Sequence, residues 1–135
     1  MKRGPQIMTP KDVGLVLART NIDKESIVVE AGTGSGALTF HLARFVKKVI
    51  SYEKREEFYK IAKENMEFFG AKNMTLKFGD VEEHLEETNV DLIVFDLAEP
   101  WKLIEKSYNA LKPGQYLVAY LPSITQIMHF VNKAK

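Results

Sequence analysis

The chain has 135 residues and a formal net charge of +1, with 45% hydrophobic and 27% charged residues. These values are typical of a single globular domain, residues 1–135, and exclude a disordered chain, while the near-neutral charge gives no overall attraction to nucleic acid or to a membrane surface. The sequence contains no cysteine, which excludes disulfides, thiolate metal sites and cysteine nucleophiles and is consistent with the reducing cytoplasm, where we expect the protein.

The predicted elements alternate between strands and helices from residue 26 to the end of the chain. In order, we expect a strand at 27–30, a helix at 36–45, a strand at 48–52, a helix at 55–69, a strand at 74–78, a short helix at 81–87, a strand at 91–95, a helix at 100–111, a strand at 115–120 and a helix at 124–132. Gly70 is expected to cap the second helix, and Lys112-Pro113-Gly114 to end the fourth. This alternation predicts an α/β, Rossmann-like fold with a mostly parallel, doubly wound sheet.

The sequence contains neither the pattern of a membrane-spanning segment nor that of a metal site. No apolar stretch reaches the roughly 18–20 residues that span a bilayer, and no apolar segment follows the basic residues at the start, so we expect neither a membrane span nor a signal peptide. The histidines, His41, His84 and His129, are scattered without the spacing of metal ligands. We therefore expect no metal site.

A glycine-rich loop, Gly32-Thr33-Gly34-Ser35-Gly36, follows the first strand directly and precedes a helix. Its G-x-G-x-G spacing differs from the G-x-G-x-x-G of most dinucleotide binders, and the G-K-[ST] ending of a P-loop is missing. The loop therefore favours a cofactor without a pyrophosphate, and S-adenosylmethionine is the candidate. We expect positive φ at Gly32 and Gly34, close packing of the helix on the first strand at Gly36, and helix N–H groups that bind the cofactor's carboxylate.

Four strands end in a carboxylate or lead directly to one: Glu30, Glu53, Asp80 and Asp96. Carboxyl ends of parallel strands meet at one edge of a sheet, so these acids are predicted to gather there. Glu53 is suited to accept hydrogen bonds from ribose hydroxyls. Asp80 can accept from an adenine amino group, with Val81 packed on the ring, or cap the short helix instead. Asp96 lies where methyl transfer needs a group that holds the nucleophile in line, or it is an acid of a helix-entry turn.

Three segments resemble the catalytic domain of the tRNA adenine-N1 methyltransferases, which modify an adenine in the T loop of tRNA. They are RGPQIMTPKD at 3–12, EAGTGSGALT at 30–39 and DLAEPW at 96–101. The first segment is the most specific, because generic methyltransferases lack it. The resemblance implies a class I S-adenosylmethionine-dependent methyltransferase that methylates N1 of adenine 57 or 58 in tRNA and releases S-adenosylhomocysteine.

The resemblance also implies roles for individual residues. The N-terminal helical region, 1–25, would line the cofactor site with Gln6, and Asp96 would lie between the cofactor and the target base as the catalytic residue. The loop and the start of the helix would contact the methionine part, Glu53 the ribose, and Asp80 with Val81 the adenine. The full set of expected cofactor contacts is Gln6, Glu30, Gly32, Gly34, Ser35, Gly36, Ala37, Leu38, Glu53, Asp80, Val81 and Asp96.

The sequence departs from the family pattern in two ways. The family usually has a small β domain before the segment at 3–12 and two further strands after the last helix predicted here, so we expect either a fragment or a minimal relative. The implied partners are tRNA and either further copies of the chain, often as a tetramer, or a partner subunit. Two alternatives stay open: a methyltransferase of the same fold that acts on a small molecule or a protein, as corrinoid-biosynthesis and isoaspartyl enzymes do, and a non-catalytic cofactor-binding subunit of a tRNA methyltransferase complex.

Overall fold

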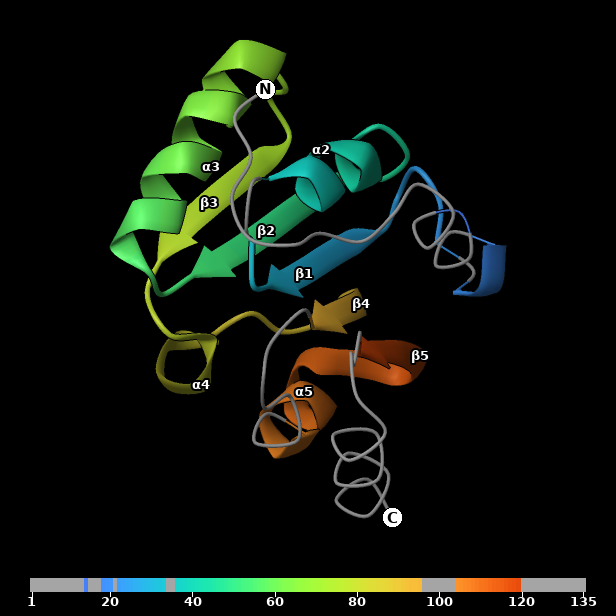
Figure 1. Cartoon of the computed structure of the whole chain (residues 1–135). Helices are drawn as coiled ribbons and strands as arrows, with labels where there is room; N and C mark the ends of the chain where they lie inside the picture. The colour runs from blue at the N-terminus through green and yellow to red at the C-terminus, as the bar shows by residue number, and fades with distance from the viewer. Residues whose placement is uncertain (1–13, 15–17, 21, 34–35, 96–103, 120–135) are drawn as a thin grey trace.

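The computed structural model describes residues 14, 18–20, 22–33, 36–95 and 104–119. Within these ranges, five parallel strands form one sheet in the order β3-β2-β1-β4-β5 (Figure 1). The strands are β1 (Ile27–Ala31), β2 (Lys48–Glu53), β3 (Met74–Phe78), β4 (Val90–Phe95) and β5 (Leu111–Ala119). The chain passes outward from β1 to β3 and then returns to the other side of β1. The strand order thus reverses beside the carboxyl end of β1, where ligands bind in such sheets.

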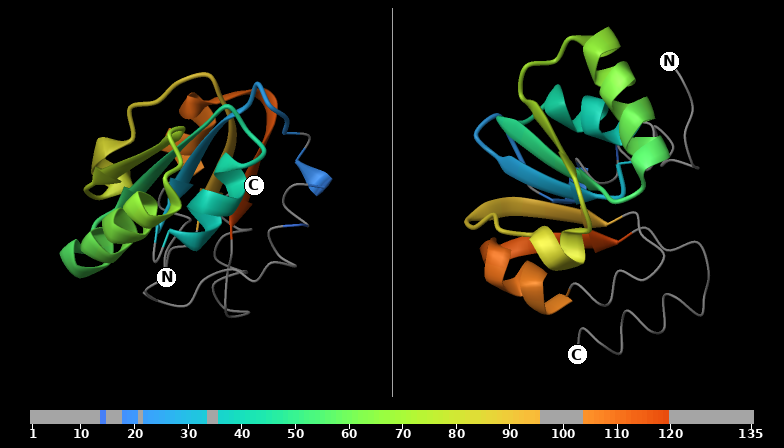
Figure 2. Two further views of the ribbon diagram at one scale, coloured as in Figure 1. Left: turned by 90° about the horizontal axis from the view of Figure 1, so that it is seen from above. Right: turned by 90° about the vertical axis from the view of Figure 1, so that its left-hand side faces the viewer.

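Helices cover both faces of the sheet. On one face lie α2 (Ala37–Ala43) and α3 (Glu56–Phe69), and on the other lie α4 (Val81–His84) and α5 (Ile104–Ala110) (Figure 2). The predicted α/β, doubly wound parallel arrangement is therefore confirmed. The predicted helix at 124–132, the start of the one at 100–111 and the end of the strand at 115–120 lie outside the described residues.

The core consists of two apolar layers because successive strand residues point to opposite faces of the sheet. Val28 packs in the layer under α2 and α3, whereas Val29 packs in the layer toward α4 and α5, and both are fully buried. Leu92 and Ile93 divide in the same way. Strands buried on both faces explain why these segments are nearly continuous apolar runs in the sequence.

The cap of α3 agrees with its prediction. Gly70 has φ 66° and donates its N–H to the Met66 carbonyl at 2.9 Å. A left-handed residue at this position ends the helix with little strain only when it is glycine. Gly70 therefore fixes where the chain leaves α3 to enter β3.

The predicted start of the fifth strand was wrong. Leu111, expected at the end of a helix, belongs to β5 and pairs with Val90. The register then shifts before Leu92 pairs with Tyr116, because Pro113 lacks an N–H for the ladder. Lys112 in this irregular stretch contacts Asp91 Oδ1 at 3.0 Å.

The short helix α4 also ends earlier than predicted. It stops at His84 because Leu85 is extended, with φ −64° and ψ 109°, so residues 85–87 do not continue the helix. The chain then passes through Asn89, which has a left-handed φ of 56°, into β4. This extended stretch brings Glu86 and Glu87 within reach of β3, as described below.

Candidate functional site

The glycine loop after β1 is anchored on the neighbouring strand. The N–H groups of Gly32 and Thr33 both donate to the carbonyl of Tyr52 in β2, at 3.0 and 3.3 Å. Gly36 N–H donates to the Thr33 carbonyl at 3.0 Å. The backbone therefore turns sharply at the carboxyl ends of two adjacent strands. Gly34 and Ser35, the two predicted contacts inside the loop, lie outside the described residues.

Two glycines of the loop have left-handed backbones, Gly32 with φ 91° and Gly36 with φ 87°. Positive φ was predicted for Gly32, and this is confirmed. The predicted reason for Gly36 was wrong: the atoms nearest to an added Cβ belong to Ala62 in α3, at an ordinary 3.8–3.9 Å, and not to β1. Backbone conformation, and not lack of space, therefore requires glycine at position 36.

Glu30 lies beneath this loop and is fully buried. Its Oε1 accepts hydrogen bonds from the Thr39 hydroxyl and, at 2.6 Å, from Ser51 Oγ. Ser51 Oγ also lies 2.6 Å from Thr33 Oγ1. These four residues, the hydroxyl network, connect β1, β2, α2 and the loop. The sequence predicted Glu30 as one of four acids gathered at the edge, but the structure encloses its carboxylate among hydroxyl groups.

Glu53 ends β2 and is 2% exposed. Its Oε2 accepts from the backbone N–H of Arg55 at 3.1 Å, and the Arg55 Nε lies 3.5 Å away. The guanidinium of Arg55 lies 4.0 Å above the ring of Phe58. The carboxylate is thus oriented by the turn that leads into α3, and its predicted contact with ribose stays a prediction.

Asp80 follows β3, next to the end of β2, since Gly79 N–H donates to the Glu53 carbonyl at 2.9 Å. Asp80 Oδ1 accepts from Glu82 N–H at 2.9 Å and so caps α4, the alternative that the sequence left open. The side chain of Val81 is 3% exposed and packs in the core layer with Tyr52. Glu53 and Asp80 therefore share one edge of the sheet, as predicted, while the Val81 side chain contributes to the core.

The first residues of α2 follow the loop directly. Ala37 begins the helix, and Gly36 precedes it without a side-chain cap. The first N–H groups of a helix have no partner within the helix, so backbone donors are present where the cofactor carboxylate was predicted to bind. The side chain of Leu38 is 5% exposed and packs in the core, which leaves its backbone for the predicted contact.

Two further predicted site residues, Gln6 and Asp96, lie outside the described residues, as does Trp101. Their predicted roles stay predictions. Within the described residues, no group of three or more histidine, cysteine, aspartate or glutamate side chains could hold a metal ion. In the same part of the chain, no helix is long and apolar enough to cross a membrane.

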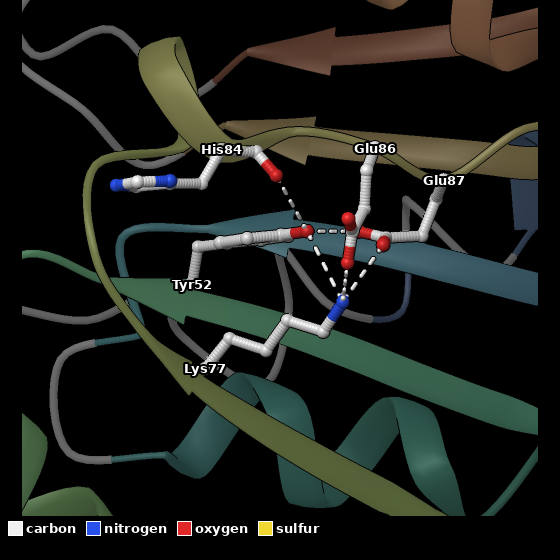
Figure 3. Close-up of polar contacts among 5 residues, drawn as sticks. All are labelled: Tyr52, Lys77, His84, Glu86 and Glu87. Atoms are coloured by element: carbon white, nitrogen blue, oxygen red, sulfur yellow. Dashed lines mark hydrogen bonds and ion pairs between the residues drawn. The ribbon is translucent and has the colours of Figure 1, made fainter.

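A second polar cluster, the Lys77 network, was not predicted. It consists of Tyr52, Lys77, Glu86 and Glu87 on the α4 side of the sheet (Figure 3). Lys77 Nζ lies 2.9 Å from Glu87 Oε2 and 3.1 Å from Glu86 Oε1, and the Tyr52 hydroxyl donates to Glu87 Oε1. No signal in the sequence indicated this cluster, because Tyr52 and Lys77 are brought together by the β2–β3 register.

Electrostatics in the Lys77 network favour the protonated forms of both donors. Burial, followed by the hydrogen bond to Glu87, raises the pKa of Tyr52 to about 12. The hydrogen bond to Glu87 raises the pKa of Lys77 above its usual value, although burial opposes this effect. The network therefore holds a neutral phenol and a cation against the Glu87 carboxylate at neutral pH.

The fold and the loop together define the class of protein. A crystal structure of the tRNA (m1A58) methyltransferase TrmI from Aquifex aeolicus superposes with a TM-score of 0.92 at 32% identity, over 98% of this chain and 55% of that one. A SAM-dependent O-methyltransferase from Thermotoga maritima superposes with a TM-score of 0.89 at 35% identity, over 95% of this chain and 50% of that one. The chain thus has the Rossmann-like fold of S-adenosylmethionine-dependent methyltransferases.

Within this class, the family model described as "tRNA methyltransferase complex GCD14 subunit" matches residues 1–135, and the chain belongs to that family. The tRNA (adenine(57)-N(1)/adenine(58)-N(1))-methyltransferase TrmI of Methanocaldococcus jannaschii is 39% identical over 100% of this chain and 58% of its own length. The chain therefore spans little more than half the length of this relative.

Proposed function

We propose that this chain is the methyl-transferring domain of an S-adenosylmethionine-dependent methyltransferase that modifies N1 of a tRNA T-loop adenine, at position 57 or 58. One observation carries the proposal: a G-x-G-x-G loop, bounded by left-handed Gly32 and Gly36, stands beside Glu53 in a chain that belongs throughout its length to a tRNA methyltransferase family. The names of its relatives supply the substrate class.

The polar groups around the loop fit this cofactor. The first N–H groups of α2 suit a carboxylate, Glu53 at the end of β2 suits a ribose diol, and Asp80 after β3 suits an amino group. These groups follow three adjacent strands, in the order in which the methionine, ribose and adenine parts of the molecule would meet them. The bound cofactor supplies an electrophilic methyl group on a sulfonium centre.

Methyl transfer to N1 needs little from the protein beyond alignment of the reacting groups. Adenine N1 is unprotonated at neutral pH, so its lone pair needs no strong base before it attacks the methyl group. Asp96 is proposed to accept a hydrogen bond from the exocyclic amino group of the base, which orients N1 and stabilises the positive charge that develops on the ring. The target base must leave its stack to reach the site.

The test is methyl transfer to an unmodified tRNA transcript, followed by nuclease digestion and mass spectrometry of the nucleosides. We expect 1-methyladenosine with the natural chain. Asp96→Ala should lower turnover far more than it weakens binding of S-adenosylmethionine, and Asp96→Asn is the size-matched companion. Unchanged turnover in Asp96→Ala would contradict the role of Asp96, whereas a natural chain that forms no methyladenosine would contradict the substrate.

Two other functions have an observation in their favour. Similarity to an O-methyltransferase supports a non-tRNA substrate, and the family description as a subunit of a complex supports a cofactor-binding subunit that needs a partner. Calorimetry with S-adenosylmethionine, then the transcript assay with and without a co-purified partner, separates these functions. The proposal includes two kinds of partner, tRNA and further copies of the chain. Light scattering with and without tRNA would measure the molar mass of the assembly and so detect both.

A further inference from the structure

We propose that Thr33 is the positioning residue of the glycine loop, oriented by a one-way chain of hydrogen bonds that ends on the buried carboxylate of Glu30. This inference rests on the proposed function, because it concerns the loop that would bind S-adenosylmethionine. It assigns to Glu30 the role of an anchor beneath the loop.

The direction of the chain follows from counting protons. Ser51 Oγ donates its single hydrogen to Glu30 Oε1 at 2.6 Å. At the 2.6 Å contact between Ser51 Oγ and Thr33 Oγ1, Ser51 can therefore act only as the acceptor, and Thr33 must be the donor. The Thr39 hydroxyl donates to the same Glu30 oxygen. A carboxylate, which accepts only, thus determines the orientation of both hydroxyls above it.

Burial makes this arrangement specific. Glu30, Ser51 and Thr39 are fully buried, and Thr33 is 3% exposed. A buried hydroxyl that loses its partner destabilises the conformation that contains it, because water cannot replace the missing bond. Thr33 therefore has one favoured position, the one in which its hydroxyl reaches Ser51.

Thr33 is held through all three of its polar groups. Its N–H donates to the Tyr52 carbonyl at 3.3 Å, its hydroxyl to Ser51, and its carbonyl accepts from Gly36 N–H at 3.0 Å. The residue lies between the two left-handed glycines, which leave the backbone free to take other conformations. Thr33 thus supplies the restraint that its glycine neighbours lack.

A loop fixed in advance binds its ligand more tightly, because less conformational freedom is lost on binding. If the hydroxyl chain is broken, only a fraction of molecules will hold the loop in its binding conformation, and the apparent affinity falls by that fraction. The effect should appear in cofactor affinity and not in turnover at saturating cofactor.

The experiment compares Thr33→Val, which keeps the shape and removes the hydroxyl, with Thr33→Ser, which keeps the hydroxyl. Isothermal titration with S-adenosylmethionine should give about a tenfold higher Kd for Thr33→Val, as expected for one lost hydrogen bond, and a value within about twofold of the natural chain for Thr33→Ser. Thr75→Val, the same change in β3, is the matched control and should bind as the natural chain does.

The steady-state constants separate positioning from a general structural defect. With tRNA as substrate, Thr33→Val should raise KM for S-adenosylmethionine while kcat and KM for tRNA remain unchanged. Ser51→Ala breaks the same chain from β2 and should raise Kd to a similar extent. It also serves as the second variant if Thr33→Val does not fold, with folding verified by circular dichroism.

The possible failures are distinguishable. A natural chain that binds no S-adenosylmethionine contradicts the proposed function, and the inference falls with it. If the natural chain binds S-adenosylmethionine and a folded Thr33→Val or Ser51→Ala variant binds it with the same affinity as the natural chain, the inference is overturned. The proposed function is then unaffected. Loss of affinity in Thr33→Ser equal to that in Thr33→Val would likewise show that the hydroxyl is not the group responsible.

Discussion

Two polar networks lie on opposite faces of β2 and satisfy their buried groups in different ways. The hydroxyl network places the fully buried Glu30 carboxylate against Ser51 and Thr39. The Lys77 network places Glu87, whose side chain is 10% exposed, against a cation and a phenol. Consecutive residues of β2, Ser51 and Tyr52, belong to the two networks because side chains of a strand alternate between faces.

The difference shows what each network can do. Short hydroxyl side chains reach only their nearest neighbours, so the hydroxyl network fixes the geometry of a few atoms beneath the loop. Lys77 has a long side chain that is 32% exposed, and it ties β3 to the extended stretch after α4. We infer that the first network determines conformation at the site, whereas the second contributes to the stability of the sheet edge.

The largest effect is expected for Glu30→Ala. The change removes the acceptor of two buried hydroxyls and leaves a void, so the free energy of unfolding should fall by about 3–5 kcal/mol. Urea denaturation followed by circular dichroism measures this loss. Glu67→Ala on the exposed side of α3 is the control and should change stability by less than about 0.5 kcal/mol. A loss below about 1 kcal/mol in Glu30→Ala would mean that the carboxylate does not hold the network together.

The next effect is expected for Glu87→Gln. The carboxylate accepts from both Tyr52 and Lys77, and the neutral amide weakens both bonds, so stability should fall by about 1–3 kcal/mol at pH 7. Cofactor affinity should stay within about twofold of the natural value if the Lys77 network serves stability alone. A tenfold loss of affinity without a loss of stability would reverse the roles given to the two networks.

Alkaline pH should weaken the Lys77 network, which contains a phenol and an ammonium group, and leave the hydroxyl network, which contains neither, unaffected. The pKa of Tyr52 rises from 10.0 to about 12 on folding, so the native state keeps a proton that the unfolded chain loses. This contribution is complete below pH 10 and is lost as the pH rises toward 12, with the raised pKa of Lys77 acting in the same direction. Between pH 9 and 11.5, the free energy of unfolding should fall less in Tyr52→Phe than in the natural chain. The difference between the two losses should be about 1–2 kcal/mol.

Urea denaturation at a series of pH values measures that slope. Tyr108→Phe is the matched control, because Tyr108 on α5 is 83% exposed and lies in neither network. Its curve should coincide with that of the natural chain. If Tyr52→Phe also coincides with the natural chain, the phenol does not retain its proton in the way that its surroundings imply.

The parts of the fold that depend on local pattern could be predicted from the sequence. The buried runs that form β1 and β4 and the glycine that ends α3 were assigned within a residue or so. The start of β5 was not, because Leu111 joins the strand through its pairing with Val90, a partner that local propensity does not reveal. The prediction of where α4 ends was wrong for a similar reason, since Glu87 contacts Tyr52 in another strand.

In the candidate site, too, local motifs could be predicted from the sequence and contacts between strands could not. Glycine at Gly32 and the acids at the ends of β2 and β3 were visible as motifs. The enclosure of Glu30 was not, because Ser51 reaches it only through the β1–β2 register that pairs the two residues. The sequence reveals which residue types lie at a strand end, whereas the packing decides whether a carboxylate meets a ligand or a neighbouring hydroxyl.

The smallest effect is expected for Glu86→Gln, which tests whether burial decides the strength of the Lys77 network. Glu86 and Glu87 contact the same ammonium group at similar distances, 3.1 and 2.9 Å, but the Glu86 side chain is 78% exposed and that of Glu87 is 10% exposed. Solvent screens the exposed pair, so Glu86→Gln should cost less than about 0.5 kcal/mol, and 1 M salt should abolish even that. The cost of Glu87→Gln should persist in salt, because the Glu87 side chain is largely shielded from water. Equal costs for the two changes would mean that the distance to Lys77, and not burial, determines what each carboxylate contributes.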